Sequence, residues 1–354
     1  MRHPYLIHHS VVSSAKLYPH KCAFKCGNYS LTYSELDLRS SQIAKNLIEN
    51  GLKKGDRVGV LMNRCLETSF SIYGIMRAGG IYVPLDHKAP KKRLSFLIKD
   101  CDIFTIITTS KQMGLVGQLQ LESLRVIMAD QLEWESECRF ESPFTILEDD
   151  PAYILYTSGS TGVPKGIVHT HRSGLAYAKL VMDTFSVSEM DVIANHAPIF
   201  FDISTFAYFA GPLAGAKVVI LEDGHTIMIA SLVKLIQNEK ITIWYSVPRA
   251  LVQLKDTGLL NKQDHSSLRW VLYAGERFPI KDLREIMAIL PSATYCNIYG
   301  PTETNQCTHY IIDNLEDLEE VPIGMVWGNT EYLVKNEDSH YYDEIAIRTL
   351  IPYR

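Results

Sequence analysis

The chain has 354 residues, a formal net charge of −5, and 46% hydrophobic against 21% charged residues. This balance is ordinary for a soluble globular protein, and the length suggests two or three compact parts. The net negative charge and the lack of a basic run argue against a nucleic-acid surface, and no stretch predicts a signal peptide or a membrane span.

The first 150 residues predict an alternation of short apolar strands with helices. Thr32 followed by Glu35 forms a capping box at the start of a helix, and Gly51 offers its end. Such alternation is typical of an α/β architecture with a largely parallel sheet. The later elements of this half are predicted strands at 58–62, 81–83, 103–108 and 126–128 and helices at 67–78 and 91–100.

The same alternation resumes from residue 151 to about residue 312. In open α/β sheets ligands bind beyond the carboxyl ends of strands. We therefore expect the loops that start at Thr157, Ala274 and Gly300 to converge there. The predicted strands are 192–194, 217–221, 241–244, 270–273 and 295–299, and the predicted helices are 175–185, 204–210 and 229–238.

A short strand from Ala152 runs into a loop of glycine and hydroxyl residues that ends at Lys165. Inward-turned backbone N–H groups, hydroxyls and one lysine suit the binding of a polyphosphate, although a Ser/Gly-rich surface loop is the alternative. It is not a Walker A loop, because Pro164 precedes the lysine and Gly166 follows it. The residues predicted to hold the phosphates are Thr157, Ser158, Gly159, Ser160, Thr161, Gly162 and Lys165.

This stretch resembles the phosphate loop of the adenylate-forming enzymes, which include acyl-CoA synthetases, luciferases and amino-acid adenylation domains. Residues 31–36 and 77–86 are similar to segments that this family carries ahead of its loop. The resemblance covers nearly all of the family's large N-terminal core. It implies an α/β fold with two βαβ subdomains at 1–150 and 151–320, and an incomplete small β subdomain at 321–354.

The segment Asn-Ile-Tyr-Gly-Pro-Thr-Glu at 297–303 places a Gly-Pro turn directly after a strand. A carboxylate beside a polyphosphate site suits Mg²⁺, whereas a turn with a solvent-facing glutamate is the alternative. The resemblance implies that Tyr299 stacks on adenine, Asn297 contacts its edge, Thr302 touches the α-phosphate and Glu303 binds the metal. It also implies adenine-side roles for Gly300 and for the strip Ala274, Gly275 and Glu276.

Asp202 lies in the segment Phe-Phe-Asp-Ile-Ser-Thr and has two interpretations. It could cap the helix predicted at 204–210. It could instead pair with a substrate ammonium inside a dry, apolar pocket. By resemblance, amino-acid adenylation domains use an aspartate in this context and enzymes for fatty or aryl acids generally lack it, and Phe201 stands where the family has an aromatic gate.

The resemblance extends to the residues that line the family's substrate pocket. The set is mostly apolar and is similar to that of prolyl-carrier-protein ligases, which favours small cyclic or apolar amino acids, with proline first. Gln306 stands where those ligases have valine, and it could admit a polar group or a different ring. The predicted lining residues are Asp202, Ile203, Phe206, Tyr245, Leu272, Ala274, Ile298, Gln306 and Cys307.

The resemblance therefore implies an ATP- and Mg²⁺-dependent ligase that forms aminoacyl-AMP and passes the acyl group to a carrier-protein thiol. The family's ribose-binding segment and its small C-terminal domain with a catalytic lysine have no counterpart in this sequence, so we expect the chain alone to be catalytically impaired. Two alternatives stay open: an acyl- or aryl-CoA synthetase core, against which Asp202 argues, and a nucleotide- or amino-acid-binding remnant that needs a partner chain.

Two weaker patterns have structural interpretations. Seven scattered cysteines without a Cys-x-x-Cys pair predict reduced, buried thiols in a cytoplasmic protein. His169 and His171 fit a strand-to-helix junction better than a metal site.

Overall fold

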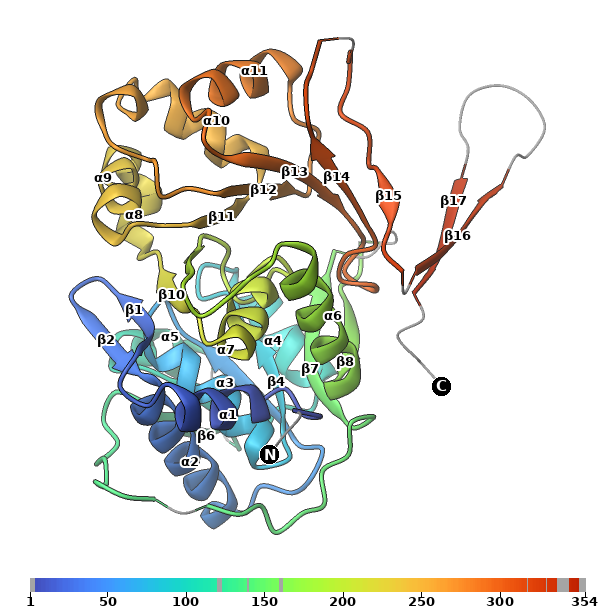
Figure 1. The fold of residues 1–354 in the computed structure, drawn as a ribbon. Coiled ribbons are helices and arrows are strands. Elements are labelled where there is room, and N and C mark those ends of the chain that lie inside the picture. The colour runs from blue at the N-terminus through green and yellow to red at the C-terminus, as the bar shows by residue number, and fades with distance from the viewer. Residues whose placement is uncertain are drawn as a thin grey trace. The chain divides into compact units, whose positions relative to one another are not determined.

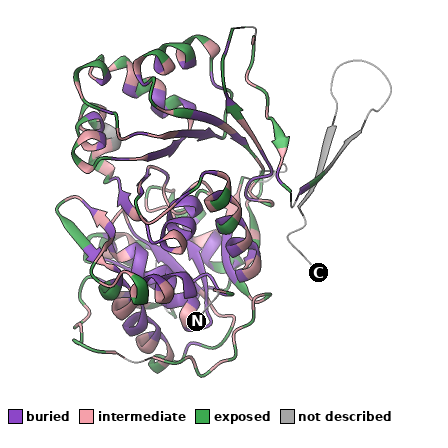
Figure 2. Cartoon of the chain, viewed as in Figure 1, coloured by how far each residue is buried: buried purple, intermediate pink, exposed green. Residues whose placement is uncertain are grey.

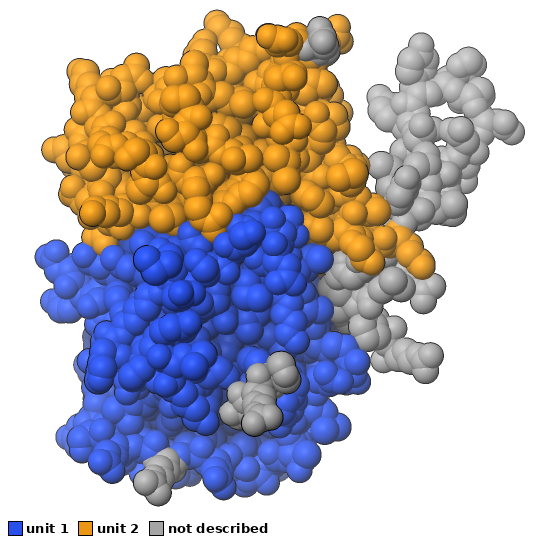
Figure 3. Space-filling view, viewed as in Figure 1, with its two compact units in different colours: residues 1–226 blue, residues 227–354 orange. Residues whose placement is uncertain are grey.

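The computed structural model describes residues 4–119, 123–138, 140–158, 162–316, 318–328, 330–335 and 344–349. The chain divides into two compact units, unit 1 at residues 1–226 and unit 2 at residues 227–354 (Figure 3). The finer subdomain boundaries expected after residues 150 and 320 stay a prediction.

Unit 1 contains a mostly parallel sheet with the strand order β6-β5-β3-β4-β7-β8 (Figure 1). Only β8 among these strands runs antiparallel to its neighbour, β7. Leu94, Leu97 and Ile98 of α4 pack in one core cluster with Ile106 of β5 and Ile154 of β7. The elements are β3 Arg57–Leu61, α3 Glu67–Arg77, β4 Ile81–Pro84, α4 Lys91–Asp100, β5 Thr105–Thr108, η1 Ser110–Gln112, α5 Met113–Gln118, β6 Arg125–Met128, β7 Pro151–Thr157 and β8 Lys165–Thr170.

A second set of strands in unit 1 has the order β9-β10-β1-β2, in which β9, β10 and β1 are parallel and β2 is antiparallel. The buried Tyr33 hydroxyl donates to the carbonyl of Ala216 at 2.6 Å. Ala216 directly precedes β10, so this bond links the start of α2 to the start of that strand. The remaining elements of the unit are α1 His9–Leu17, β1 Cys22–Cys26, β2 Tyr29–Thr32, α2 Tyr33–Glu49, α6 His171–Thr184, β9 Val192–Asn195, the π-helical η2 Phe206–Ala210, α7 Gly211–Ala214, β10 Lys217–Ile220 and α8 Asp223–Ile227.

The capping box predicted at the start of α2 is confirmed. The Thr32 hydroxyl accepts from the Glu35 amide at 3.2 Å, and the Glu35 carboxylate accepts from the Thr32 amide at 2.7 Å. The helix then packs closely on α3, because a Cβ on Gly74 would lie 2.5 Å from the side chain of Ile43. Figure 2 shows how burial concentrates on the strands and on the inner helix faces.

Unit 2 has the strand order β15-β14-β13-β12-β11, with β11 to β13 parallel and β14 and β15 antiparallel. β16 and β17 pair as a separate antiparallel two-stranded sheet within the region predicted as a small β subdomain, whose bounds stay a prediction. The elements are α9 Ile229–Glu239, β11 Ile243–Ser246, α10 Pro248–Asp256, η3 Leu260–Lys262, β12 Trp270–Ala274, α11 Ile280–Ile289, β13 Thr294–Tyr299, β14 Thr308–Ile312, β15 Met325–Val326, β16 Thr330–Lys335 and β17 Glu344–Thr349.

Two predicted strands begin two residues later than expected, at Thr105 and Ile243. The apolar residues ahead of them, Ile103 and Ile241, donate their amides to carbonyls of the last turns of α4 and α9, at 2.9 and 3.0 Å. These bonds end the preceding helices, so the two residues belong to helix stops and not to strands.

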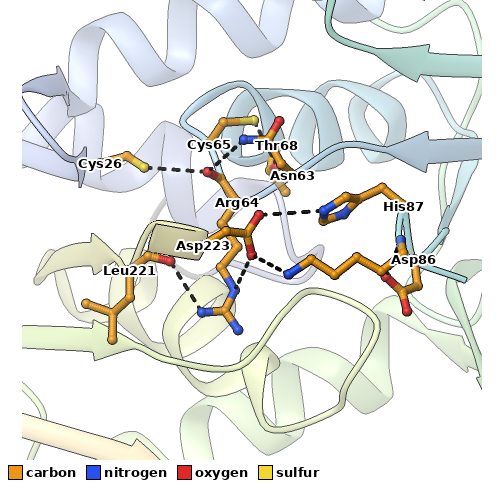
Figure 4. A network of polar contacts seen from close by, with 10 residues as sticks. Cys26, Asn63, Arg64, Cys65, Thr68, Asp86, His87, Leu221 and Asp223 are labelled. Carbon is orange, nitrogen blue, oxygen red and sulfur yellow. Dashed lines mark hydrogen bonds and ion pairs between the residues drawn. The ribbon is translucent and has the colours of Figure 1, made fainter. Parts of the chain in front are cut away.

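A carboxylate near the end of unit 1 gathers basic side chains (Figure 4). Asp223 Oδ1 lies 3.2 Å from Lys88 Nζ and 3.8 Å from Arg64 Nε, and Oδ2 lies 3.6 Å from His87 Nε2. Arg64 also donates to the Leu221 carbonyl at 3.4 Å. The network ties the segment entering α8 to the loops after β3 and β4. The cavity beside it, about 50 Å³, has room for no more than a few waters.

All seven cysteines are described and none forms a disulfide. The predicted burial holds for Cys26, Cys101, Cys296 and Cys307, whereas Cys22, Cys65 and Cys138 are only partly buried. Within the described ranges no helix has the length and hydropathy needed to cross a membrane.

A group of buried histidines lies where α1 and α6 begin. The ring centroid of His8 is 4.7 Å from that of His9 and 5.6 Å from that of His171. Burial lowers the pKa of His9 to about 4 and that of His171 to about 3. Burial and the neighbouring imidazoles hold the pKa of His8 well below its usual range. The sequence had indicated only that His171 follows a strand, which the boundary between β8 and α6 confirms.

We expect the free energy of unfolding to fall as the pH drops from about 6.5 toward 4, because the unfolded chain binds protons that the folded histidines refuse. Each such histidine contributes a slope of about 1.4 kcal/mol per pH unit inside that window. The variant His9→Gln should lose about one histidine's share of the slope, as measured by urea unfolding between pH 4.5 and 7.5. His20→Gln, at an exposed histidine of the same unit, serves as the control. Parallel curves for native protein and His9→Gln would contradict the expectation.

Candidate functional site

The glycine-hydroxyl loop of unit 1 is carried by the hairpin of β7 and β8. Thr157 pairs with Lys165 in the ladder, and the side chains of Lys165 and Ser158 are exposed. Gly162 has a φ of 79°, a conformation that favours glycine. Gly159, Ser160 and Thr161, which were also predicted to hold phosphates, lie outside the described residues.

The loop end of this hairpin is fixed to the end of α4. The Tyr156 hydroxyl donates to the Asp100 carboxylate at 2.5 Å and lies 3.1 Å from the Cys101 sulfur. Gly166 allows the close approach, since a Cβ there would lie 3.2 Å from the Tyr156 ring. The exposed cation of Lys165 is therefore mounted on a rigid pair of strands.

Asp202 and Phe201 lie in a turn at the start of a helix in unit 1. The Asp202 carboxylate accepts from the Ile203 amide at 2.8 Å. Because Ile203 precedes the first residue of the helix, this hydrogen bond is not an N-cap of the helix. The Phe201 side chain is 55% exposed. The helix predicted at 204–210 forms, but from Phe206 it winds as the π-helical η2, and Phe206 is wholly buried. Such π-turns often occur at functional sites.

Several predicted pocket residues of unit 2 share one face of its sheet. Tyr245 of β11 lies opposite Leu272 of β12, and Ala274 lies opposite Ile298 of β13. Alternate residues of a strand point to the same side, so these side chains form one surface. Asn297 falls on the other face of the sheet, and its amide nitrogen donates to the Pro322 carbonyl at 2.8 Å.

The loop after β12 also carries a structural contact that the sequence did not reveal. Gly275 has a φ of 92°. The carboxylate of the exposed Glu276 accepts from the Arg249 amide at 2.8 Å, which satisfies an N–H in the first turn of α10. Glu276, predicted on the adenine side, is thus engaged by its own unit.

The loop after β13 is closed by the Cys307 amide, which donates to the Tyr299 carbonyl at 2.9 Å. Thr302 and the exposed Glu303 lie in the turn between them. Gly300 has no room for a side chain, because a Cβ there would lie 2.4 Å from the Gln306 Cα. The Tyr299 side chain is 41% exposed, which leaves part of the ring open for stacking.

Gln306 and Cys307 follow this turn and are buried. The Gln306 amide nitrogen donates to the Tyr245 hydroxyl. The Cys307 thiol lies 3.3 Å from the Tyr299 carbonyl, and burial raises its pKa to about 11. The thiol therefore stays protonated near neutral pH and is not a nucleophile.

Unit 1 carries the hairpin lysine and the Asp202 turn, and unit 2 carries the apolar sheet face with the Tyr299 and Glu303 loop. Among the described residues no group of three or more His, Cys, Asp or Glu side chains is arranged to hold a metal by itself. A cation at Glu303 would accordingly need further oxygen ligands from a bound molecule.

Comparison with known proteins shows the family of the chain. The AMP-binding enzyme family matches residues 11–345. An L-proline–[L-prolyl-carrier protein] ligase of Streptomyces coelicolor is 36% identical over 320 residues, which cover 84% of this chain and 60% of the ligase. A ligase of the same name from Pseudomonas fluorescens is 30% identical over 342 residues, which cover 94% of this chain and 69% of that protein.

Among solved structures, the nonribosomal peptide synthetase FmoA3 in its alpha-methyl-L-serine-AMP bound form is similar with a TM-score of 0.88 at 27% identity. That similarity covers 98% of this chain and 40% of the synthetase chain. The predicted family and the α/β fold class are confirmed. The chain spans 60% and 69% of the lengths of the two ligases.

The variant Gly300→Ala should be destabilised by about 1–3 kcal/mol, the usual cost of forcing atoms into a packed site, because its new methyl overlaps the Gln306 backbone. Gly328→Ala, at a glycine of the same unit with open space around it, should change stability by less than about 0.5 kcal/mol. Denaturant unfolding measures both. Equal stabilities of the two variants would show that the 300–306 turn is not closed in this way.

Proposed function

The chain belongs to the AMP-binding enzyme family, and on that premise we propose that it activates the carboxyl group of an amino acid with ATP. A carboxylate oxygen attacks the α-phosphorus, the bond from that phosphorus to the oxygen leading to the β-phosphate breaks, and pyrophosphate leaves. The product is an aminoacyl-AMP. Its acyl group then passes to the phosphopantetheine thiol of a carrier protein.

The half-buried carboxylate of Asp202 carries the proposal of an amino-acid substrate. It lies in a turn between the exposed Phe201 and the buried π-helical segment with Phe206. An ammonium is a fitting partner for a carboxylate held partly out of water, and a fatty or aryl acid brings no such group. The two similar ligases are named for L-proline, which supports the same class of substrate.

The residues proposed to interact with the phosphates or their Mg²⁺ are Thr157, Ser158, Lys165, Thr302 and Glu303. Lys165, with Thr157 and Ser158 beside it, supplies positive charge and hydroxyl donors from a rigid hairpin. Thr302 is assigned to the α-phosphate. Glu303 offers an exposed carboxylate oxygen, which fits Mg²⁺, and bound Mg²⁺ would neutralise charge on the phosphates. The chain's part in catalysis is positioning and electrostatic stabilisation.

On the adenine side, Tyr299 would stack on the base from its partly exposed ring. Asn297 and the backbone of Ala274, Gly275 and Gly300 would border it. Among substrates we place proline and other small cyclic or apolar amino acids first, because the apolar sheet face with Tyr245 is similar to the lining of prolyl-carrier-protein ligases.

Amino-acid-dependent exchange of pyrophosphate into ATP tests the proposal. We expect exchange with proline or a near relative, and Asp202→Asn should lower kcat/KM about ten- to a hundredfold because it removes a charge-assisted hydrogen bond to the ammonium. Asp183→Asn, at an exposed aspartate on α6, is the matched control and should exchange normally.

Two results would contradict the proposal. Exchange with fatty or aryl acids that is indifferent to Asp202→Asn would indicate an acyl- or aryl-CoA synthetase core. Binding of Mg·ATP without exchange or binding of any amino acid would indicate a remnant that needs a partner chain.

A further inference from the structure

A buried amide in unit 2 is left half satisfied. Gln306 is 5% exposed, and its side-chain nitrogen donates to the Tyr245 hydroxyl. Its side-chain oxygen is inaccessible to solvent and has no hydrogen-bond partner in the described part of the chain. A buried acceptor without a partner costs free energy, and native structures retain few of them.

The amide is held where it is. The Gln306 backbone N–H donates to the Thr304 carbonyl, and the next amide, that of Cys307, donates to the Tyr299 carbonyl, each at 2.9 Å. Gly300 packs against its Cα. Tyr245 is itself 2% exposed on β11. These contacts hold the Gln306 backbone, and the burial of the residue keeps its amide out of water.

Exchanging the amide oxygen and nitrogen does not remove the problem. The oxygen would then accept from the Tyr245 hydroxyl. The nitrogen would stand at the position without a partner, and its two N–H groups would be buried and unpaired. The predicted lining residues of the same sheet face, Leu272, Ala274 and Ile298, have apolar side chains and offer neither a donor nor an acceptor. The missing partner therefore comes from outside these lining residues, from a bound ligand or from a water.

We infer that the amino acid activated by this chain carries a hydroxyl group that hydrogen-bonds to Gln306. A hydroxyl both donates and accepts, so it satisfies the amide in either orientation. The inference rests on the proposed function and narrows its substrate class from small or cyclic amino acids to their hydroxyl-bearing members.

Pairs of amino acids that differ by one hydroxyl test the inference on the full chain. The pairs are L-proline and its hydroxylated forms, alanine and serine, and valine and threonine. In at least one pair we expect the hydroxylated member to be preferred by about tenfold or more in pyrophosphate exchange, because the member without a hydroxyl leaves the buried amide unpaired. The same pairs are compared by the shift in Tm that each produces, so the outcome does not depend on turnover.

Substitutions then assign the preference to the amide. Gln306→Val should reverse or abolish it, and Tyr245→Phe, which keeps the ring but removes the hydroxyl that holds Gln306, should weaken it. Gln253→Val makes the same exchange at an exposed glutamine of α10, outside the predicted lining, and should leave the ratio within each pair unchanged.

The two proposals fail in different ways. If no amino acid exchanges or binds, the proposed function fails. If amino acids exchange or bind but the members without a hydroxyl do as well or better, or if Gln306→Val leaves the ratio unchanged, the hydroxyl inference is overturned and a trapped water satisfies the amide.

Discussion

The parallel register of β11, β12 and β13 is the constraint on which the candidate site of unit 2 depends. It puts Tyr245 beside Leu272 and Ala274 beside Ile298, so that one face of the sheet collects the apolar lining. A slip of one residue would turn this set away and bring Tyr273 in its place. Because strands that are buried on both faces show no alternation of polar and apolar residues, packing and the loops at the strand ends have to hold this register.

The same constraint places the reactive groups at strand ends. β13 ends at Tyr299, and a backbone bond from Cys307 folds the following turn back onto it. That bond fixes Glu303 and Gln306 from a single anchor, although one is exposed and the other is buried. In unit 1 the hairpin of β7 and β8 holds Lys165 in place, because its backbone pairs with that of Thr157 in the strand ladder. Strands and the bonds at their ends thus position the charged groups, and the loops between them set only the distance along the chain.

Local sequence patterns predicted the helices and strands well where a pattern is compatible with a single local structure. The capping box of Thr32 and Glu35 has a single use, and it forms. An apolar residue after a helix has two uses, and Ile103 and Ile241 close helices instead of opening strands. The contact of Gln306 with Tyr245 joins residues 61 positions apart, so no local pattern contains it. Motif resemblance predicted a set of site residues but not the contacts that these residues make in the structure.

Polar groups in an apolar pocket discriminate in two different ways. In the function proposed here, the carboxylate of Asp202 would select by charge, which sorts whole classes of acid. The neutral amide of Gln306 would select by hydrogen bonding, and a site built this way rejects a ligand that lacks the partner more strongly than an apolar pocket rejects an extra hydroxyl. The amide lowers the stability of the unliganded chain, since an apolar residue at this position would carry no desolvation penalty. A buried amide of this kind is expected where a bound ligand supplies the missing hydrogen bond. The free energy that the unliganded chain loses is then recovered only with ligands that carry the matching group, and this makes the site specific.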